Sequence, residues 1–177
     1  MKKLISKTAK IQKITVVESL SELREIIGKR NEDNSGIVDL TDIDVSKLKE
    51  LNWICSYAQD IKKINISGWN VQAISLSHMF YDCLRLEEII GIGDLNLHTV
   101  KSIDHMFARC KSLKHLDLSK WDVSKIESAY SLFSNCSSLE EIKGVEDEQW
   151  SKIPKKALMF NFCKQKVYPE WFLKNLE

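Results

Sequence analysis

The sequence is poor in the residues that interrupt or loosen a fold. Only two of its 177 residues are proline and six are glycine, so we expect one domain without a long flexible linker. No apolar run reaches the roughly 18 residues that a membrane-spanning helix needs. Lys7, Lys10 and Lys13 interrupt the amino-terminal stretch where the apolar part of an export signal would lie. We therefore expect a cytoplasmic protein that does not contact a membrane.

Neither sign of charge is in excess. The chain has 26 basic and 25 acidic residues and a net charge of +1, which argues against a broad surface for nucleic-acid phosphates. Residues 1–13 are a local exception, because they contain five lysines and no acidic residue. Nucleic-acid binding through this lysine-rich start stays open as an alternative, although a solvated tail is the simpler interpretation.

The five cysteines lack the close spacing of a metal site, because no Cys-x-x-Cys occurs. Four of them recur in steps of 27, 26 and 27 residues. These are Cys83, Cys110, Cys136 and Cys163, and Cys55 lies three residues before the same place in an earlier repeat. An odd number of cysteines in a cytoplasmic chain disfavours disulfides, and a buried free thiol packs like a small hydrophobic group. We expect structural cysteines, with neither metal nor cofactor.

A repeat surrounds each of these cysteines. Residues 106–123 read Met-Phe-x-x-Cys-x-x-Leu-x-x-Leu-x-Leu-x-x-Trp-x-Val, and parts of this pattern occur before and after them. A fixed period of this length is typical of solenoids. We expect each repeat to contain a short strand, a loop and a short helix ending near the cysteine. The apolar residues at offsets −7, −4, −3 and 0 from the cysteine fit one helical face.

The chain ends differ from the repeats. Residues 10–17 alternate like a strand. Ser19 and Glu22 form a capping box at the start of a helix that we expect to end near Gly28. The predicted organisation is one domain over residues 1–177, with an amino-terminal strand–helix cap (1–36), repeats (37–165) and a carboxy-terminal cap (166–177).

The repeat resembles that of the BspA-type leucine-rich repeat family of bacteria, whose units read like Met-Phe-x-x-Cys-x-x-Leu-x-x-Leu-x-Leu-Ser-x-Trp-x-Val-Ser. The resemblance covers about residues 37–165 and is closest over 76–139. It implies an α/β leucine-rich repeat solenoid of about five turns, with a short parallel sheet on the concave face. It also implies a binding protein without a shared catalytic centre, and several exported members act in adhesion.

Polar side chains flanking the inward-facing leucines are expected to form two ladders on the concave face. The first runs through Ile37, Lys63, Glu88, His115 and Glu141. The second runs through Asp39, Asn65, Ile90, Asp117 and Lys143. From these ladders we assign to partner binding Lys63, Asn65, Glu88, Ile90, His115, Asp117, Glu141 and Lys143.

His115 is expected to lie between Glu88 and Glu141, where two carboxylates favour the imidazolium form. The functional interpretation is a pH-sensitive anchor for a basic or polar partner segment, and the simpler one is a solvated row of charges. Trp150, beside the acidic residues 146–148, is the candidate for an exposed aromatic anchor.

Other groupings carry little chemistry. His78 and His105 share the position five residues before the cysteine, so we expect them to stack and to point away from the thiols rather than bind a metal. A histidine between carboxylates lacks a nucleophile, which argues against a hydrolase.

The sequence therefore predicts a monomeric, non-enzymatic module that binds another protein as an inhibitor or adaptor. Adhesion or host contact is an alternative, and nucleic-acid binding is a second.

Overall fold

The computed structural model describes residues 13–174. Its amino-terminal part contains β1 (Thr15–Val16), α1 (Leu20–Arg30), β2 (Ile37–Asp39) and β3 (Ile43–Asp44). Ser19 caps α1 as expected, because its hydroxyl accepts a hydrogen bond from the Glu22 amide. The helix continues through Gly28, where we expected its end, and Asn31 follows as the C-cap. Of the predicted strand 10–17, residues 10–12 lie outside the described residues, and within 13–17 β1 forms and pairs with β3.

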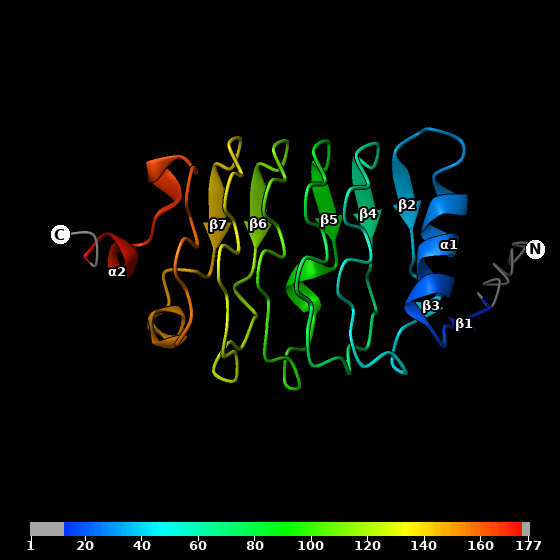
Figure 1. Ribbon diagram of the computed structural model, residues 1–177, viewed down its shortest axis with the longest axis horizontal. Coiled ribbons are helices and arrows are strands. Elements are labelled where there is room, and N and C mark those ends of the chain that lie inside the picture. Colours follow the sequence, from blue (N-terminus) through cyan, green and yellow to red (C-terminus); the bar gives the residue numbers. More distant parts are fainter. Residues whose placement is uncertain (1–12, 175–177) are drawn as a thin grey trace, which may run out of the picture.

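The repeats bring short strands side by side along the long axis of the molecule (Figure 1). After β2 these are β4 (Lys63–Asn65), β5 (Glu88–Ile90), β6 (His115–Asp117) and β7 (Glu141–Lys143). On another side of the molecule, single parallel bridges link the repeats, through Glu50, Ser75, Ser102, Ser128 and Lys155.

The predicted fold class, an α/β leucine-rich repeat solenoid of about five turns, is wrong. Over residues 13–174 the structure has two α-helices, and neither lies within the repeats. Its strands are only two or three residues long, and they form three small sheets instead of one. These sheets are β1–β3, β2–β4–β5 and β6–β7.

Turns replace the helix that we expected before each cysteine. In the repeat of Cys83, the amides of His78 and Asp82 donate to carbonyl groups of the next repeat, not to a residue four positions earlier. Both residues have positive φ, of 60° and 58°, which no α-helix contains. The same two positions, five and one before the cysteine, have positive φ in every later repeat as well. The offsets −7, −4, −3 and 0 therefore fit a series of β-turns as well as they fit a helix.

Apolar side chains form columns through the interior. Phe80, Phe107, Phe133 and Phe160 stack with centroid separations of 5.9, 5.7 and 5.4 Å. Beside them run the cysteines, all with free thiols as expected. Each thiol from Cys83 onward donates to a main-chain carbonyl of the preceding repeat, at 2.8 to 3.1 Å. A cysteine suits this place because it is small and apolar and still supplies a weak donor.

The carboxy-terminal end is covered by side chains from a short segment. After η2 (Glu148–Lys152) and η3 (Gln165–Val167), α2 spans Glu170–Leu173. The Phe172 ring packs edge-on against Phe160, with centroids 5.0 Å apart, and the Trp171 indole N–H donates to the Val145 carbonyl at 2.7 Å. The described part of the predicted cap thus closes the column of phenylalanines.

Burial makes the thiols poor nucleophiles, because the reactive thiolate is disfavoured away from water. It raises the pKa of Cys83 to about 12 and that of the less buried Cys163 to about 11. We expect iodoacetamide at pH 8 to modify the folded protein slowly and at Cys163 first, and to modify all five cysteines in denaturant. Peptide mapping by mass spectrometry checks this order. Rapid modification of Cys110 in the folded protein would contradict the buried column.

Two buried tryptophans provide a matched test of the interior. Trp121 and Trp150 stack at 6.3 Å, but the Trp121 indole N–H donates to the Ile92 carbonyl at 2.8 Å, whereas the Trp150 indole nitrogen has no hydrogen-bond partner. Both substitutions Trp121→Phe and Trp150→Phe shrink the ring, and only the first removes a hydrogen bond. We expect Trp121→Phe to lower the free energy of unfolding by about 1 kcal/mol more than Trp150→Phe. Urea unfolding of the two variants measures the difference, and equal losses would show that the hydrogen bond is unimportant.

Candidate functional site

The outward side chains of β2, β4, β5, β6 and β7 make up what we call the strand face. Within each sheet the predicted register is confirmed, since Lys63 pairs with Glu88 and His115 with Glu141. The Lys63 ammonium lies 2.7 Å from a Glu88 oxygen, and His115 Nδ1 lies 3.9 Å from a Glu141 oxygen. These side chains are 40 to 63% exposed, so such ion pairs contribute little to stability and remain available to a partner.

The second predicted ladder is partly used by the scaffold. Asn65 and Asp117 each accept a hydrogen bond from the amide two residues later, at 3.1 Å, and so hold the turn that follows their strand. Bonds from the Ser119 hydroxyl and amide also lower the pKa of Asp117, which keeps it charged. Ile90 is half-buried and Lys143 is exposed. This ladder therefore has both structural and solvent-facing members.

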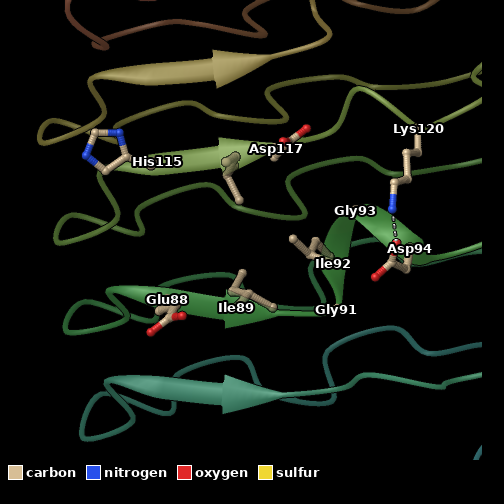
Figure 2. Close-up of a pocket in the computed structure, with 10 residues that line it drawn as sticks. Glu88, Ile89, Gly91, Ile92, Gly93, Asp94, His115, Asp117 and Lys120 are labelled. Carbon is tan, nitrogen blue, oxygen red and sulfur yellow. Dashed lines mark hydrogen bonds and ion pairs between the residues drawn. The ribbon is translucent and has the colours of Figure 1, made fainter.

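The two ladders are interrupted between β5 and β6, which we did not anticipate. The pairs Glu88–His115 and Ile90–Asp117, implied by the sequence, do not form, because β5 and β6 belong to separate sheets. His115 therefore pairs with Glu141 alone. The space between the two strands is a cleft of about 260 Å³, and Figure 2 shows Glu88 and His115 on its two sides. We call this space the β5–β6 cleft.

The predicted aromatic anchor is wrong. Trp150 is 0% exposed and packs inside the molecule against Trp121. Local sequence suggested exposure because acidic residues precede it. The structure turns those residues outward and places the indole in the interior column.

A second surface consists of aromatic side chains on the turns before the cysteines. Trp53 stacks on His78 with centroids 3.7 Å apart, and His78 stacks on His105 at 4.6 Å, as expected for these two histidines. Other rings join this stack by edge contacts at 5.3 to 5.7 Å. We call the whole group the aromatic row: Trp53, Tyr57, His78, Tyr81, His105 and Tyr130.

One ion pair lies beside the aromatic row. The Arg109 guanidinium contacts the carboxylate of Asp82, whose side chain is only 8% exposed. In the last repeat, Leu158 and Phe162 occupy the two positive-φ positions, and they are 46% and 70% exposed. Apolar side chains are thus exposed at both ends of this series of turns.

Burial disfavours a charge on the two histidines. The pKa of His78 is lowered to about 4 by burial and by the neighbouring His105, against a weaker opposing effect of Asp104. Burial also lowers the pKa of His105. His78 Nδ1 is buried without a hydrogen-bond partner. Among the described residues no group of three or more His, Cys, Asp or Glu side chains could hold a metal ion.

The aromatic row could have been found from the repeat. His78 and His105 lie five residues before Cys83 and Cys110, and Tyr81 lies two residues before Cys83. In the earlier repeat, where Ala58 takes the cysteine position, Trp53 and Tyr57 lie five residues and one residue before it. The sequence pattern suggested a helix at these positions, and we predicted stacking for the two histidines alone. The helical interpretation hid the fact that these five aromatic side chains contact one another on one surface.

Residues 7–90 and 49–171 match the family described as "Mycoplasma protein of unknown function, DUF285", and the chain belongs to this family. No curated protein matches the chain, and neither does any solved structure. The resemblance to BspA-type repeats stays a prediction about relatedness, separate from the corrected fold.

None of the helices within residues 13–174 is long and apolar enough to cross a membrane. Of the lysine-rich start, residues 1–12 lie outside the described part, so nucleic-acid binding there stays a prediction, as does adhesion.

The lowered pKa of His78 makes stability depend on pH. Between pH 6.5 and 4 the unfolded chain takes up a proton at His78, whereas the folded chain does not. The free energy of unfolding therefore falls as the pH drops through this range. We expect His78→Asn to reduce that fall, because asparagine tolerates positive φ and does not titrate.

Urea unfolding at pH 7 and pH 4.5 measures this effect, with His98→Asn at an exposed histidine as the control. The same loss of stability on acidification in the wild type and in His78→Asn would show that His78 is not the cause.

Proposed function

We propose that this chain is a non-enzymatic protein-binding module that acts as an inhibitor or adaptor. The observation that carries the proposal is the gathering of exposed apolar side chains on the turns. Of the nine large hydrophobic side chains that are exposed within the described residues, five belong to the aromatic row or to its equivalent positions in the last repeat. Those five are Trp53, Tyr57, Tyr130, Leu158 and Phe162. Ring contacts through the aromatic row connect the first three of them, and an exposed apolar surface of this kind is characteristic of interaction sites.

The composition of the aromatic row favours a protein partner. Interfaces are enriched in tyrosine, tryptophan and arginine, and depleted in lysine and glutamate. The row has three tyrosines and one tryptophan, with Arg109 beside it and neither lysine nor glutamate within it. Trp53, His78 and His105 cover one another's ring faces, so they offer mainly edges to a ligand. A surface that binds nucleobases by stacking needs open ring faces.

The backbone beneath the aromatic row is rigid, which lowers the entropic cost of binding. The amides of Trp53 and His78 donate to the Ser77 and Asp104 carbonyls of the next repeat, at 3.3 and 2.8 Å. The side chains are therefore held in place before a partner arrives. The strand face is the second proposed contact surface, with Glu88, His115 and Glu141 at its centre.

We place the protein in the cytoplasm, as a monomer. Its five cysteines are free, and cytosolic conditions keep thiols reduced. The oligomeric state follows from sedimentation at several concentrations.

Affinity capture from lysate of the organism that makes the protein tests the function. The first variant combines Trp53→Asn with Tyr57→Asn, because asparagine is compatible with the positive φ of both positions. The matched control is Ile74→Asn, at an exposed apolar residue outside the row. We expect the double variant to bind the captured partner at least tenfold more weakly and the control to bind it normally.

A second variant replaces Glu88, His115 and Glu141 together by alanine and reports on the strand face. Circular dichroism and urea unfolding show that each variant is folded. Equal capture of the same partner by the wild type and by both variants would overturn both surface assignments.

A further inference from the structure

The β5–β6 cleft has the form of a missing strand. On one side β2, β4 and β5 are paired in parallel, and on the other side β6 and β7 are paired in parallel. Figures 1 and 2 show β5 and β6 farther apart than the paired strands on either side, with the two strands still running in the same direction. The sheet is open at one place and regular on both sides of it.

The segment Gly91–Asp94, which we call the wedge, lies between β5 and β6 at one end of the cleft. Gly91, with φ of 86°, turns the chain out of β5 and into η1 (Ile92–Asp94), which contacts β6. Gly93 lies so close to β6 that a Cβ atom there would be 2.5 Å from the Asp117 carbonyl oxygen. The Ile92 carbonyl is fixed by the Trp121 indole N–H. The wedge separates the strands at one end of the cleft and leaves the end near Glu88 and His115 open (Figure 2).

Both strands direct main-chain groups into the cleft. The Glu88 amide donates toward β4 and the Ile90 carbonyl accepts from it, so the alternate residue, Ile89, has its amide and carbonyl directed to the other side. On β6 the Lys114 carbonyl accepts from β7 and the Leu118 amide donates to β7. By the same alternation, the peptide groups of His115 face the cleft. These are the unpaired edges that strand addition uses.

The lining adds specificity to these edges. The floor consists of the apolar side chains of Ile89, Ile92 and Leu116. The polar lining consists of the three carboxylates Glu88, Asp94 and Asp117, together with His115 and Lys120. Glu88 is paired with Lys63 and Asp94 with Lys120, both at 2.7 Å, whereas the charge of Asp117 is held by the Ser119 hydroxyl and amide. Acidic side chains therefore outnumber basic ones in the lining, and Asp117 can pair with a cation.

We infer that the β5–β6 cleft binds an extended segment of a partner protein, which pairs with both strands and places a lysine or arginine side chain against Asp117. The inserted segment joins the two sheets into one. The inference rests on the proposed function, since it names the kind of segment that the strand face receives. Main-chain pairing supplies affinity, and the carboxylate selects a basic side chain.

Titration of the 15N-labelled full chain with a synthetic peptide tests the inference. The probe is acetyl-Thr-Val-Lys-Val-Thr-amide, which is rich in strand-forming residues and has one lysine. We expect the amide signals of Ile89 and His115 to shift in a saturable manner. A peptide N-methylated at both valines loses the hydrogen-bond donors along one of its two edges, and we expect it to bind at least tenfold more weakly. A peptide with glutamate in place of lysine should be weakened similarly.

The protein variants are Asp117→Asn and its control Asp122→Asn. Both aspartates accept a hydrogen bond from the serine amide two residues later, and asparagine can keep that bond, so the two substitutions perturb local structure alike. We expect Asp117→Asn to bind the lysine peptide about tenfold more weakly and Asp122→Asn to bind it as the wild type does. Equal binding of the lysine and glutamate peptides would overturn the charge assignment, and equal binding of the N-methylated peptide would overturn strand pairing.

Absence of saturable shifts with every peptide would overturn the inference as a whole. The proposed function is judged separately by partner capture with the Trp53→Asn/Tyr57→Asn variant, which leaves the cleft intact. If partner capture depends on the aromatic row but no peptide binds, the inference about the cleft is wrong and the proposed function still holds.

Discussion

The structure depends on hydrogen bonds between the turns of neighbouring repeats. In each repeat that is followed by another, the amides at positions seven, five, three and one before the cysteine position donate to carbonyl groups of the next repeat. Amides between them close turns within their own repeat. This alternation requires positive φ at the fifth and first positions before the cysteine. A non-glycine residue pays about 1–2 kcal/mol for that conformation. The interrepeat bonds and the packing beneath them offset this cost, because an unpaired amide in the interior would cost a similar amount.

The interior columns follow from the same constraint. Once the turns are in register, side chains at equivalent positions meet their counterparts in the next repeat, which aligns Phe80, Phe107, Phe133 and Phe160. The cysteine lies at the end of the turns, next to a carbonyl group of the preceding repeat. Its thiol donates a hydrogen bond to that carbonyl. Tryptophans do the same on another side, as Trp69 and Trp121 donate to the Leu40 and Ile92 carbonyls. The repeat residues thus satisfy main-chain groups as well as filling space.

Function is left to the positions that the scaffold does not use. Along the turns, four of the six residues of the aromatic row occupy positive-φ positions, whereas Asp82 and Ser131 at equivalent positions are buried. Along the strands, the outward residues form charged pairs such as Lys63 and Glu88, which are exposed and weak. The turn at Gly91 leads the chain out of β5 and into η1, and the β5–β6 cleft lies where these two regions of regular structure meet. One irregularity in a regular array therefore accompanies a cleft that main-chain groups of two sheets face.

The sequence by itself determined the period, the structural role of the cysteines and the register of the strands within each sheet. The repeat pattern aligns Lys63 with Glu88 and His115 with Glu141, because the pairing of two strands follows from which positions of their repeats are equivalent. The local pattern could not distinguish a helix from turns before the cysteine, because both structures bury the apolar side chains at offsets −7, −4, −3 and 0. The tertiary structure decided that point, because the amides there bond to another repeat.

Tertiary structure also decided what lies between the regular positions. Trp150 follows acidic residues and was therefore predicted to be exposed. In the structure it is buried, because its ring stacks on Trp121 in the interior. The separation of β5 from β6 depends on how the turn at Gly91 and Gly93 packs against Asp117 and Trp121. The surfaces proposed to bind partners arise from such contacts between repeats, which no single repeat specifies.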